Sequence, residues 1–320
     1  MTRSNSSCHA LNGDRPLSAL GKIGYFLLNL ANNALPYMRL DPRLEIRDFW
    51  CPTLTQRWAA VERLASPSRT LSNLFWMTLP WSAVREELGE IRVLDVGCGR
   101  GNYAPRLLAW SGGAIATYVG LDARPSERWA HLEAADSRLR FRQVTASHVL
   151  DAIPEGTNLI LSQSAVEHFD DDLRFFRLVR NYVLATHGPV LQVHLVPSQA
   201  CLMLYLLHGV RQYTPRTLSR VTRLFGGDTR VLVYRLGGRA CNRLHAVFIR
   251  DPLLTRRRSD RRNLQPDEYD RRLLAAITGD MQHPQRSPAF YALVIHSRPS
   301  GPDLFATVPR PCGPVGARTP

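Results

Sequence analysis

The chain has 320 residues, of which 44% are hydrophobic, so it is long enough to bury a full core in one large domain with extensions. A net charge of +14 would ordinarily suggest a polyanionic partner. Nearly all of this charge is arginine spread along the chain, however, so a coding bias explains it about as well as a nucleic-acid-binding surface. The arginine-rich run 256–262 is interpreted as a solvated loop.

Cysteine spacing and hydropathy narrow the class further. The six cysteines lie far apart without a C-x-x-C pair, which excludes a disulfide framework, and we expect no metal site. We therefore predict reduced cysteines in a cytoplasmic protein. The apolar stretch 17–36 is interrupted by Lys22 and three asparagines, so it falls short of the roughly 20 apolar residues that a membrane span needs.

In chain order, residues 1–88 predict a helical extension, because apolar residues recur at helical spacing around 17–34, 55–64 and 71–87. Residues 89–300 have the texture of an α/β domain, with an insert at about 237–288. The tail 301–320 is rich in proline and glycine without periodicity, which predicts disorder.

Short β-branched runs alternate with helical stretches within the central domain. This alternation is typical of βαβ units and a mostly parallel sheet flanked by helices. The five predicted strands are 91–96, 117–122, 139–145, 158–163 and 189–196.

The turn after the first predicted strand carries Gly97, Gly99 and Gly101, and Asp95 precedes it. Glycines let a backbone bend tightly and approach a ligand closely, and the turn after the first strand of an open parallel sheet borders the ligand crevice. The spacing departs from the G-x-G-x-x-G of dinucleotide sites. Asp95 would repel a pyrophosphate but would suit a ligand with a positive charge.

Asp122 ends the second predicted strand, where a carboxylate is placed to accept the hydroxyls of a ribose. A ribose and a cation without phosphate describe S-adenosylmethionine (SAM). From Asp95 through the three glycines to Asp122, the sequence resembles the class I SAM-dependent methyltransferases of small-molecule type. The resemblance covers about residues 90–236, with a weaker echo near 290–298.

The resemblance implies a Rossmann-like fold with a mostly parallel seven-stranded sheet and SAM as the cofactor. It implies that Gly97, Gly99 and Gly101 wrap the methionine part, that Asp95 supports its amino end through the loop, and that Asp122 holds the ribose. Ser164, after the fourth strand, is a further cofactor-binding candidate. The stretch 145–151 carries no acid where the family often receives the adenine amine, which leaves that contact open.

The segments after the fourth and fifth strands bear on the methyl acceptor. The run "SQSAVEHF" lacks the proline-rich turn of enzymes that methylate base amines, and no cysteine nucleophile for base carbons is found near it. We therefore expect an acceptor among small metabolites, sugars or lipids, methylated at a hydroxyl, with His168 as the general base. The alternative is that Glu167 and His168 only anchor a helix start. His208 and Tyr213 are predicted acceptor contacts, whereas His194 reads as a packed strand residue.

Two other functions stay open: a nucleic-acid methyltransferase, favoured only by charge, and a binding protein that keeps the fold without catalysis. The apolar stripe of residues 17–35 allows two placements. It packs over the acceptor pocket as a lid, or it lies on a membrane surface and brings the enzyme to an amphiphilic acceptor. We expect the lid.

Overall fold

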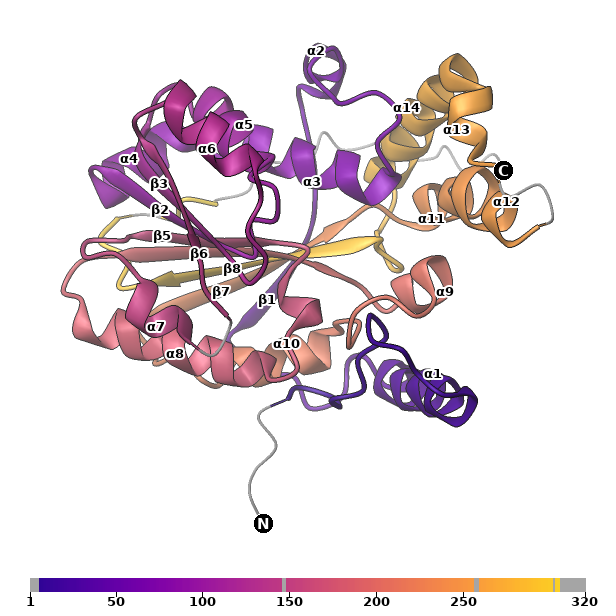
Figure 1. Ribbon diagram of the computed structural model, residues 1–320, viewed down its shortest axis with the longest axis horizontal. Coiled ribbons are helices and arrows are strands. Elements are labelled where there is room, and N and C mark those ends of the chain that lie inside the picture. Colours follow the sequence, from indigo (N-terminus) through magenta and orange to yellow (C-terminus); the bar gives the residue numbers. More distant parts are fainter. Residues whose placement is uncertain (1–5, 146–147, 256–258, 302, 306–320) are drawn as a thin grey trace, which may run out of the picture.

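The computed structural model describes residues 6–145, 148–255, 259–301 and 303–305. Its centre is an eight-stranded sheet in the order β1-β7-β8-β6-β5-β2-β3-β4 (Figure 1). Every neighbouring pair is parallel except β6–β8 and β7–β8, so β8 is the antiparallel strand. The strands are β1 (Leu44–Asp48), β2 (Ile91–Val96), β3 (Ile115–Asp122), β4 (Leu139–Gln143), β5 (Leu159–Gln163), β6 (Val190–Pro197), β7 (Thr229–Leu236) and β8 (Phe290–Ser297).

Helices cover both faces of this sheet. On one face lie α3 (Pro67–Thr78), α4 (Trp81–Leu88), α5 (Tyr103–Trp110) and α6 (Arg128–Ala135), and on the other α7 (Val149–Ala152), α8 (Asp172–Ala185) and α10 (Pro215–Thr222) (Figure 1). The remaining elements are α1 (Ala19–Ala34), α2 (Leu54–Trp58), the 3₁₀ turn η2 (Val166–His168), α9 (Cys201–Tyr205), α11 (Arg239–His245), the π-helical η3 (Ala246–Arg250), α12 (Asp251–Leu254), α13 (Arg261–Leu264) and α14 (Pro266–Gln282). The α/β Rossmann-like fold predicted from the sequence is confirmed.

Burial explains the pattern that identified the strands. All residues of β5, β6 and β8 are buried, as in a sheet covered on both faces. Each face of the sheet has its own apolar core, one beneath α3 to α5 and one beneath α8 and α10. Between these two cores, the carboxyl ends of the neighbouring strands β2, β3 and β5 lie side by side, and the site residues are found at these strand ends.

The sheet has one strand more than the seven expected. The additional strand, β1, comes from the region predicted as a helical extension, between two of its predicted helical stretches. It pairs in parallel with β7, from Leu44 opposite Val231 to Asp48 opposite Arg235. Its five residues alternate apolar and charged side chains only from Leu44 to Arg47, which is too short for a clear period-2 signal. Residues 1–88 are therefore not only an extension, because they complete the sheet at its edge.

Helix α1 differs from the expected lid in the face that it buries. Its buried residues are Tyr25, Asn29 and Asn32, whereas Leu20 and Leu27 are 81% and 60% exposed. The polar face is inside because its groups hydrogen-bond the chain beneath: the Tyr25 hydroxyl donates to the His208 carbonyl at 3.0 Å. Packing of the apolar stripe over the core was thus the wrong expectation.

Two sequence features fall partly outside the described residues. Of the arginine-rich run, 256–258 lies outside them, while Arg261 and Arg262 begin α13 and Arg262 pairs with Asp260. The predicted disordered tail lies outside them except for residues 301 and 303–305. The predicted insert between β7 and β8 consists of the helical elements α11 to α14 with η3.

Candidate active site

The glycine turn between β2 and α5 serves two purposes. Gly97, Gly99 and Gly101 have φ of +79°, +55° and +75°, a region that favours glycine. A Cβ on Gly97 would lie 2.3 Å from the Ala165 Cβ, and one on Gly101 would lie 2.8 Å from atoms of Leu132 and Phe141. These two positions are therefore glycine because of close packing.

Gly99 differs, since a Cβ there would meet nothing within 4 Å. It lies at the mouth of a pocket of about 690 Å³ that Asp122 and Arg124 also line. The Asp122 carboxylate accepts the Gly99 N–H at 2.8 Å and the Arg124 N–H at 2.9 Å. A carboxylate has about four acceptor positions, so Asp122 keeps capacity for ligand hydroxyls while it fixes the turn.

Asp95 is buried behind the same turn, with 1% exposure. Its Oδ2 accepts the Tyr118 hydroxyl at 2.5 Å, whereas its Oδ1 has no hydrogen-bond partner among the described residues. Burial raises the pKa of Asp95 to about 7, although the Tyr118 hydrogen bond opposes the shift. A buried carboxylate oxygen without a partner indicates a group suited to a cationic ligand or a further donor.

Ser164 is placed against the glycine turn by the end of β5. It has a φ of +53°, uncommon for a residue with a side chain, and its N–H donates to the Leu195 carbonyl at 2.9 Å. Its neighbour Ala165 is the residue that packs against Gly97. The structure thus brings Asp95, Ser164 and the glycines to one edge of the sheet.

His168 lies on η2, beyond β5, and meets a residue from the N-terminal segment. Its Nδ1 is 2.5 Å from Oδ2 of Asp14, whose other oxygen accepts the Gly209 N–H at 3.0 Å. Burial alone would raise the pKa of Asp14, but the hydrogen bonds from His168 and Gly209 outweigh it and hold the pKa below its ordinary value. An ionised Asp14 therefore fixes the orientation of the His168 ring.

Glu167 and His208 complete this group. Glu167 is 1% exposed, burial raises its pKa to about 7, and its Oε2 has no hydrogen-bond partner among the described residues. The His208 ring meets the His168 ring edge-on at 4.7 Å between centroids. Burial and then the neighbouring His168 lower the pKa of His208. One candidate ligand atom from each of Glu167, His168 and His208 falls within a 4.8 Å group.

Two other sequence candidates are internal. Tyr213 is fully buried, and its hydroxyl donates to Oδ2 of Asp172 at 2.9 Å, where it helps to satisfy a buried carboxylate. It therefore offers no exposed group to an acceptor in this structure. His194 is the packed strand residue that was expected: it is fully buried, its Nδ1 is 2.9 Å from the Ser162 Oγ, and burial lowers its pKa to about 3.

Sequence reasoning missed Asp14. It is separated from His168 by 154 positions, and no local pattern marks it. The adenine contact stays open, because residues 146 and 147 lie outside the described residues.

The helix after the site, α10, matches its sequence signals. Thr214 caps it by accepting the Thr217 N–H, and Pro215 occupies its first turn.

Comparison with known proteins agrees with this arrangement. A family model described as "Methyltransferase domain" matches residues 94–188, which run from β2 through the glycine turn to the end of α8. A comparison with curated proteins gives no match.

Solved structures are similar in fold at low identity. The plantazolicin methyltransferase BamL, in complex with a triazolic desmethylPZN analog and SAH, has a TM-score of 0.46 and 13% identity, over 77% of this chain and 90% of that one. A SAM-dependent methyltransferase from Archaeoglobus fulgidus gives 0.40 and 19%, over 69% and 94%. The mycolic acid cyclopropane synthase CmaA1, complexed with SAH and CTAB, gives 0.39 and 16%, over 68% and 83%.

The domain match coincides with the acid-and-glycine turn and with the sheet edge that gathers Asp95, Gly99 and Asp122. Residues 94–188 therefore carry a methyltransferase domain, within a chain of α/β Rossmann-like fold.

Proposed function

We propose that the protein transfers the methyl group of SAM to a hydroxyl of a small-molecule, sugar or lipid acceptor, with His168 as the general base. The observation that carries the proposal is the 2.5 Å contact between the Asp14 carboxylate and the His168 ring. His168 lies on η2, which directly follows the end of β5 and the residue that packs against the glycine turn. Glu167 and His208 border the same position.

The residues of the glycine turn fit the cofactor. Gly99 faces open space at a pocket mouth, where a Cβ would stand in the way of a ligand. The unpaired Oδ1 of Asp95 suits the amino end of the methionine part, and the spare acceptor positions of Asp122 suit the ribose hydroxyls. The cofactor supplies an electrophilic methyl on a sulfonium, so the chain has to align the acceptor and to take up one proton.

His168 is arranged to take that proton. When its Nδ1–H donates to the Asp14 carboxylate, the Nε2 lone pair is free to accept a proton from a hydroxyl. Asp14 then stabilises the imidazolium that forms, as the orienting carboxylate does in other histidine-based pairs. His208 stands beside His168 with its side chain 49% exposed, where it can contact the acceptor.

Isotope-labelled SAM, incubated with the protein and a cell extract that contains metabolites, lipids and RNA, tests the proposal. Mass spectrometry is expected to find a labelled methyl ether among small molecules, sugars or lipids. His168→Gln should lower the initial rate by at least about 100-fold, the lower range for a positioned base. His187→Ala, an exposed position just beyond α8, is the matched control. Label found only in RNA would favour the nucleic-acid alternative and contradict the proposal.

A further inference from the structure

Helix α1 presents an apolar face to solvent. Five of its large apolar side chains or close neighbours are more than half exposed: Leu20 at 81%, Ile23 at 56%, Leu27 at 60%, Leu30 at 51% and Leu35 at 55%. Scattered exposed leucines need no explanation, but a contiguous apolar face marks a contact surface.

The helix is held with this face outward by specific polar bonds. Besides the Tyr25 bond, the Asn32 side-chain amide donates to the Gln212 carbonyl at 3.1 Å, and Arg216 donates to the Asn32 carbonyl at 2.9 Å. Turning the helix would leave these buried polar groups without partners, at a cost of about 1–3 kcal/mol for each group. The outward apolar face is therefore a built feature of the fold.

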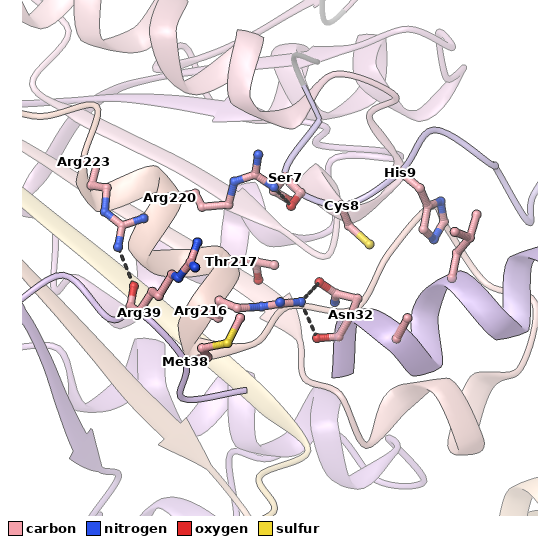
Figure 2. Close-up of a pocket in the computed structure, with 12 residues that line it drawn as sticks. Ser7, Cys8, His9, Asn32, Met38, Arg39, Arg216, Thr217, Arg220 and Arg223 are labelled. Atoms are coloured by element: carbon pink, nitrogen blue, oxygen red, sulfur yellow. Dashed lines mark hydrogen bonds between the residues drawn. The ribbon is translucent and has the colours of Figure 1, made fainter. Parts of the chain in front are cut away.

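A basic pocket adjoins the helix. It has a volume of about 470 Å³, and its lining includes Arg39, Arg216, Arg220 and Arg223 but no acidic residue (Figure 2). Arg216, Arg220 and Arg223 are spaced by four and three positions, which puts them on one face of α10 and its end. Ala31 of α1, one helical turn after Leu27, lines the same pocket, so the apolar face borders the arginines.

Acidic side chains compensate only part of the positive charge of this pocket. Arg216 and Arg220 donate to the carbonyls of Asn32 and Ser7, which are neutral acceptors. Arg223 donates to the Arg39 carbonyl and forms a long ion pair with Asp41, at 3.8 Å from its Nε to the carboxylate. Four arginines around one pocket fit phosphate groups, which arginine binds in bidentate fashion.

We propose that α1 and this pocket dock the protein on an anionic membrane surface, with the apolar face of α1 in the acyl boundary and a lipid phosphate among the arginines. An interfacial helix combines these two elements, an apolar face and flanking basic groups. A second copy of the chain fits less well, because a two-fold contact through this face would bring the two sets of arginines together. The inference does not depend on the proposed hydroxyl chemistry.

Flotation of the full-length protein with vesicles tests the docking. We expect binding to phosphatidylcholine vesicles that contain phosphatidylglycerol, weaker binding as salt is raised, and little binding to phosphatidylcholine alone. The triple variant Leu20→Ser/Ile23→Ser/Leu27→Ser should bind roughly 100-fold more weakly, from the loss of apolar burial. Arg39→Gln/Arg220→Gln should weaken binding roughly 30-fold, from about fivefold per charge.

The matched controls remove equal numbers of groups elsewhere. Leu184→Ser/Leu254→Ser/Leu264→Ser removes leucines that are 61%, 63% and 66% exposed, and Arg142→Gln/Arg174→Gln removes two exposed arginines. Both control variants should bind like the unaltered protein, and all variants should keep its melting temperature within a few degrees. A full-length protein that stays at the bottom of the gradient at low salt would overturn the proposal. So would a dimer in light scattering that the α1 variant converts to a monomer.

Discussion

The glycine turn allows packing and ligand binding to be separated by two substitutions of the same kind. Gly97→Ala and Gly99→Ala both place an L side chain at positive φ, +79° and +55°, which costs about 1 kcal/mol. Only at Gly97 does the new Cβ meet another atom, the Ala165 Cβ at 2.3 Å. Overpacking of this kind adds about 1–3 kcal/mol, so Gly97→Ala should be destabilised by roughly 2–4 kcal/mol in total.

Gly99→Ala should behave in the opposite way. Its free energy of unfolding should fall by only about 1 kcal/mol, because nothing lies within 4 Å of the new Cβ. That methyl group points at the space proposed for the cofactor, where overpacking should weaken binding of S-adenosylhomocysteine roughly five- to 150-fold. Gly112→Ala is the matched control: its φ is +59°, its Cβ also meets nothing, and it lies outside this turn.

Urea unfolding and isothermal calorimetry measure the two effects. The order of stability should be Gly97→Ala below Gly99→Ala and Gly112→Ala, with the last two nearly equal. The order of affinity should place Gly99→Ala below Gly112→Ala. If Gly99→Ala bound S-adenosylhomocysteine as tightly as Gly112→Ala does, the open side of Gly99 would not be the cofactor site, and the argument from the pocket would fail.

Three further predictions concern the carboxylates and histidines of the site. Asp14→Asn should lower the rate of methyl transfer by about tenfold or more through misorientation of His168, with little change in the affinity for S-adenosylhomocysteine by calorimetry. Because His168 is proposed as a base and not as a ligand, EDTA should leave the rate unchanged; a loss that a divalent cation restores would instead make Glu167, His168 and His208 a metal site. Burial raises the pKa of Asp95 to about 7, so its contribution to stability is present below pH 4 and is lost as the pH rises to about 7. In urea unfolding, the stability of Asp95→Asn relative to the unaltered protein should therefore increase between pH 4 and pH 8. A difference in stability that does not change with pH would contradict the raised pKa.

The strands that are buried on both faces of the sheet could be predicted from the sequence. Residues 91–96 and 158–163 read as strands because they are apolar on both faces, and the structure has β2 and β5 there. The short edge strand β1 was missed because only Leu44 among its residues is buried and three of the other four residues are charged. Local pattern identifies a strand only when enough of its residues are apolar, wherever its pairing partner lies along the chain.

The site residues also differ in whether local sequence pattern reveals them. Asp122 and the glycines could be placed because they end consecutive strands, and the chain order fixes their common edge. Asp14 could not, because its partner His168 is brought to it by tertiary packing alone. The orientation of α1 was missed for a related reason. Periodicity locates the apolar face of a helix but does not say whether that face packs on the protein core or faces solvent or a membrane.

The pairing of β1 with β7 has a consequence for synthesis of the chain. Leu44 pairs with Val231, 187 residues later, so at about 5–20 residues per second the ribosome leaves β1 without its partner for roughly 10–40 s. During this time an unpaired strand is a template for aggregation. Three of the five residues of β1 are charged, Glu45, Arg47 and Asp48, so we expect the unpaired segment to be a poor template for other chains until β7 emerges.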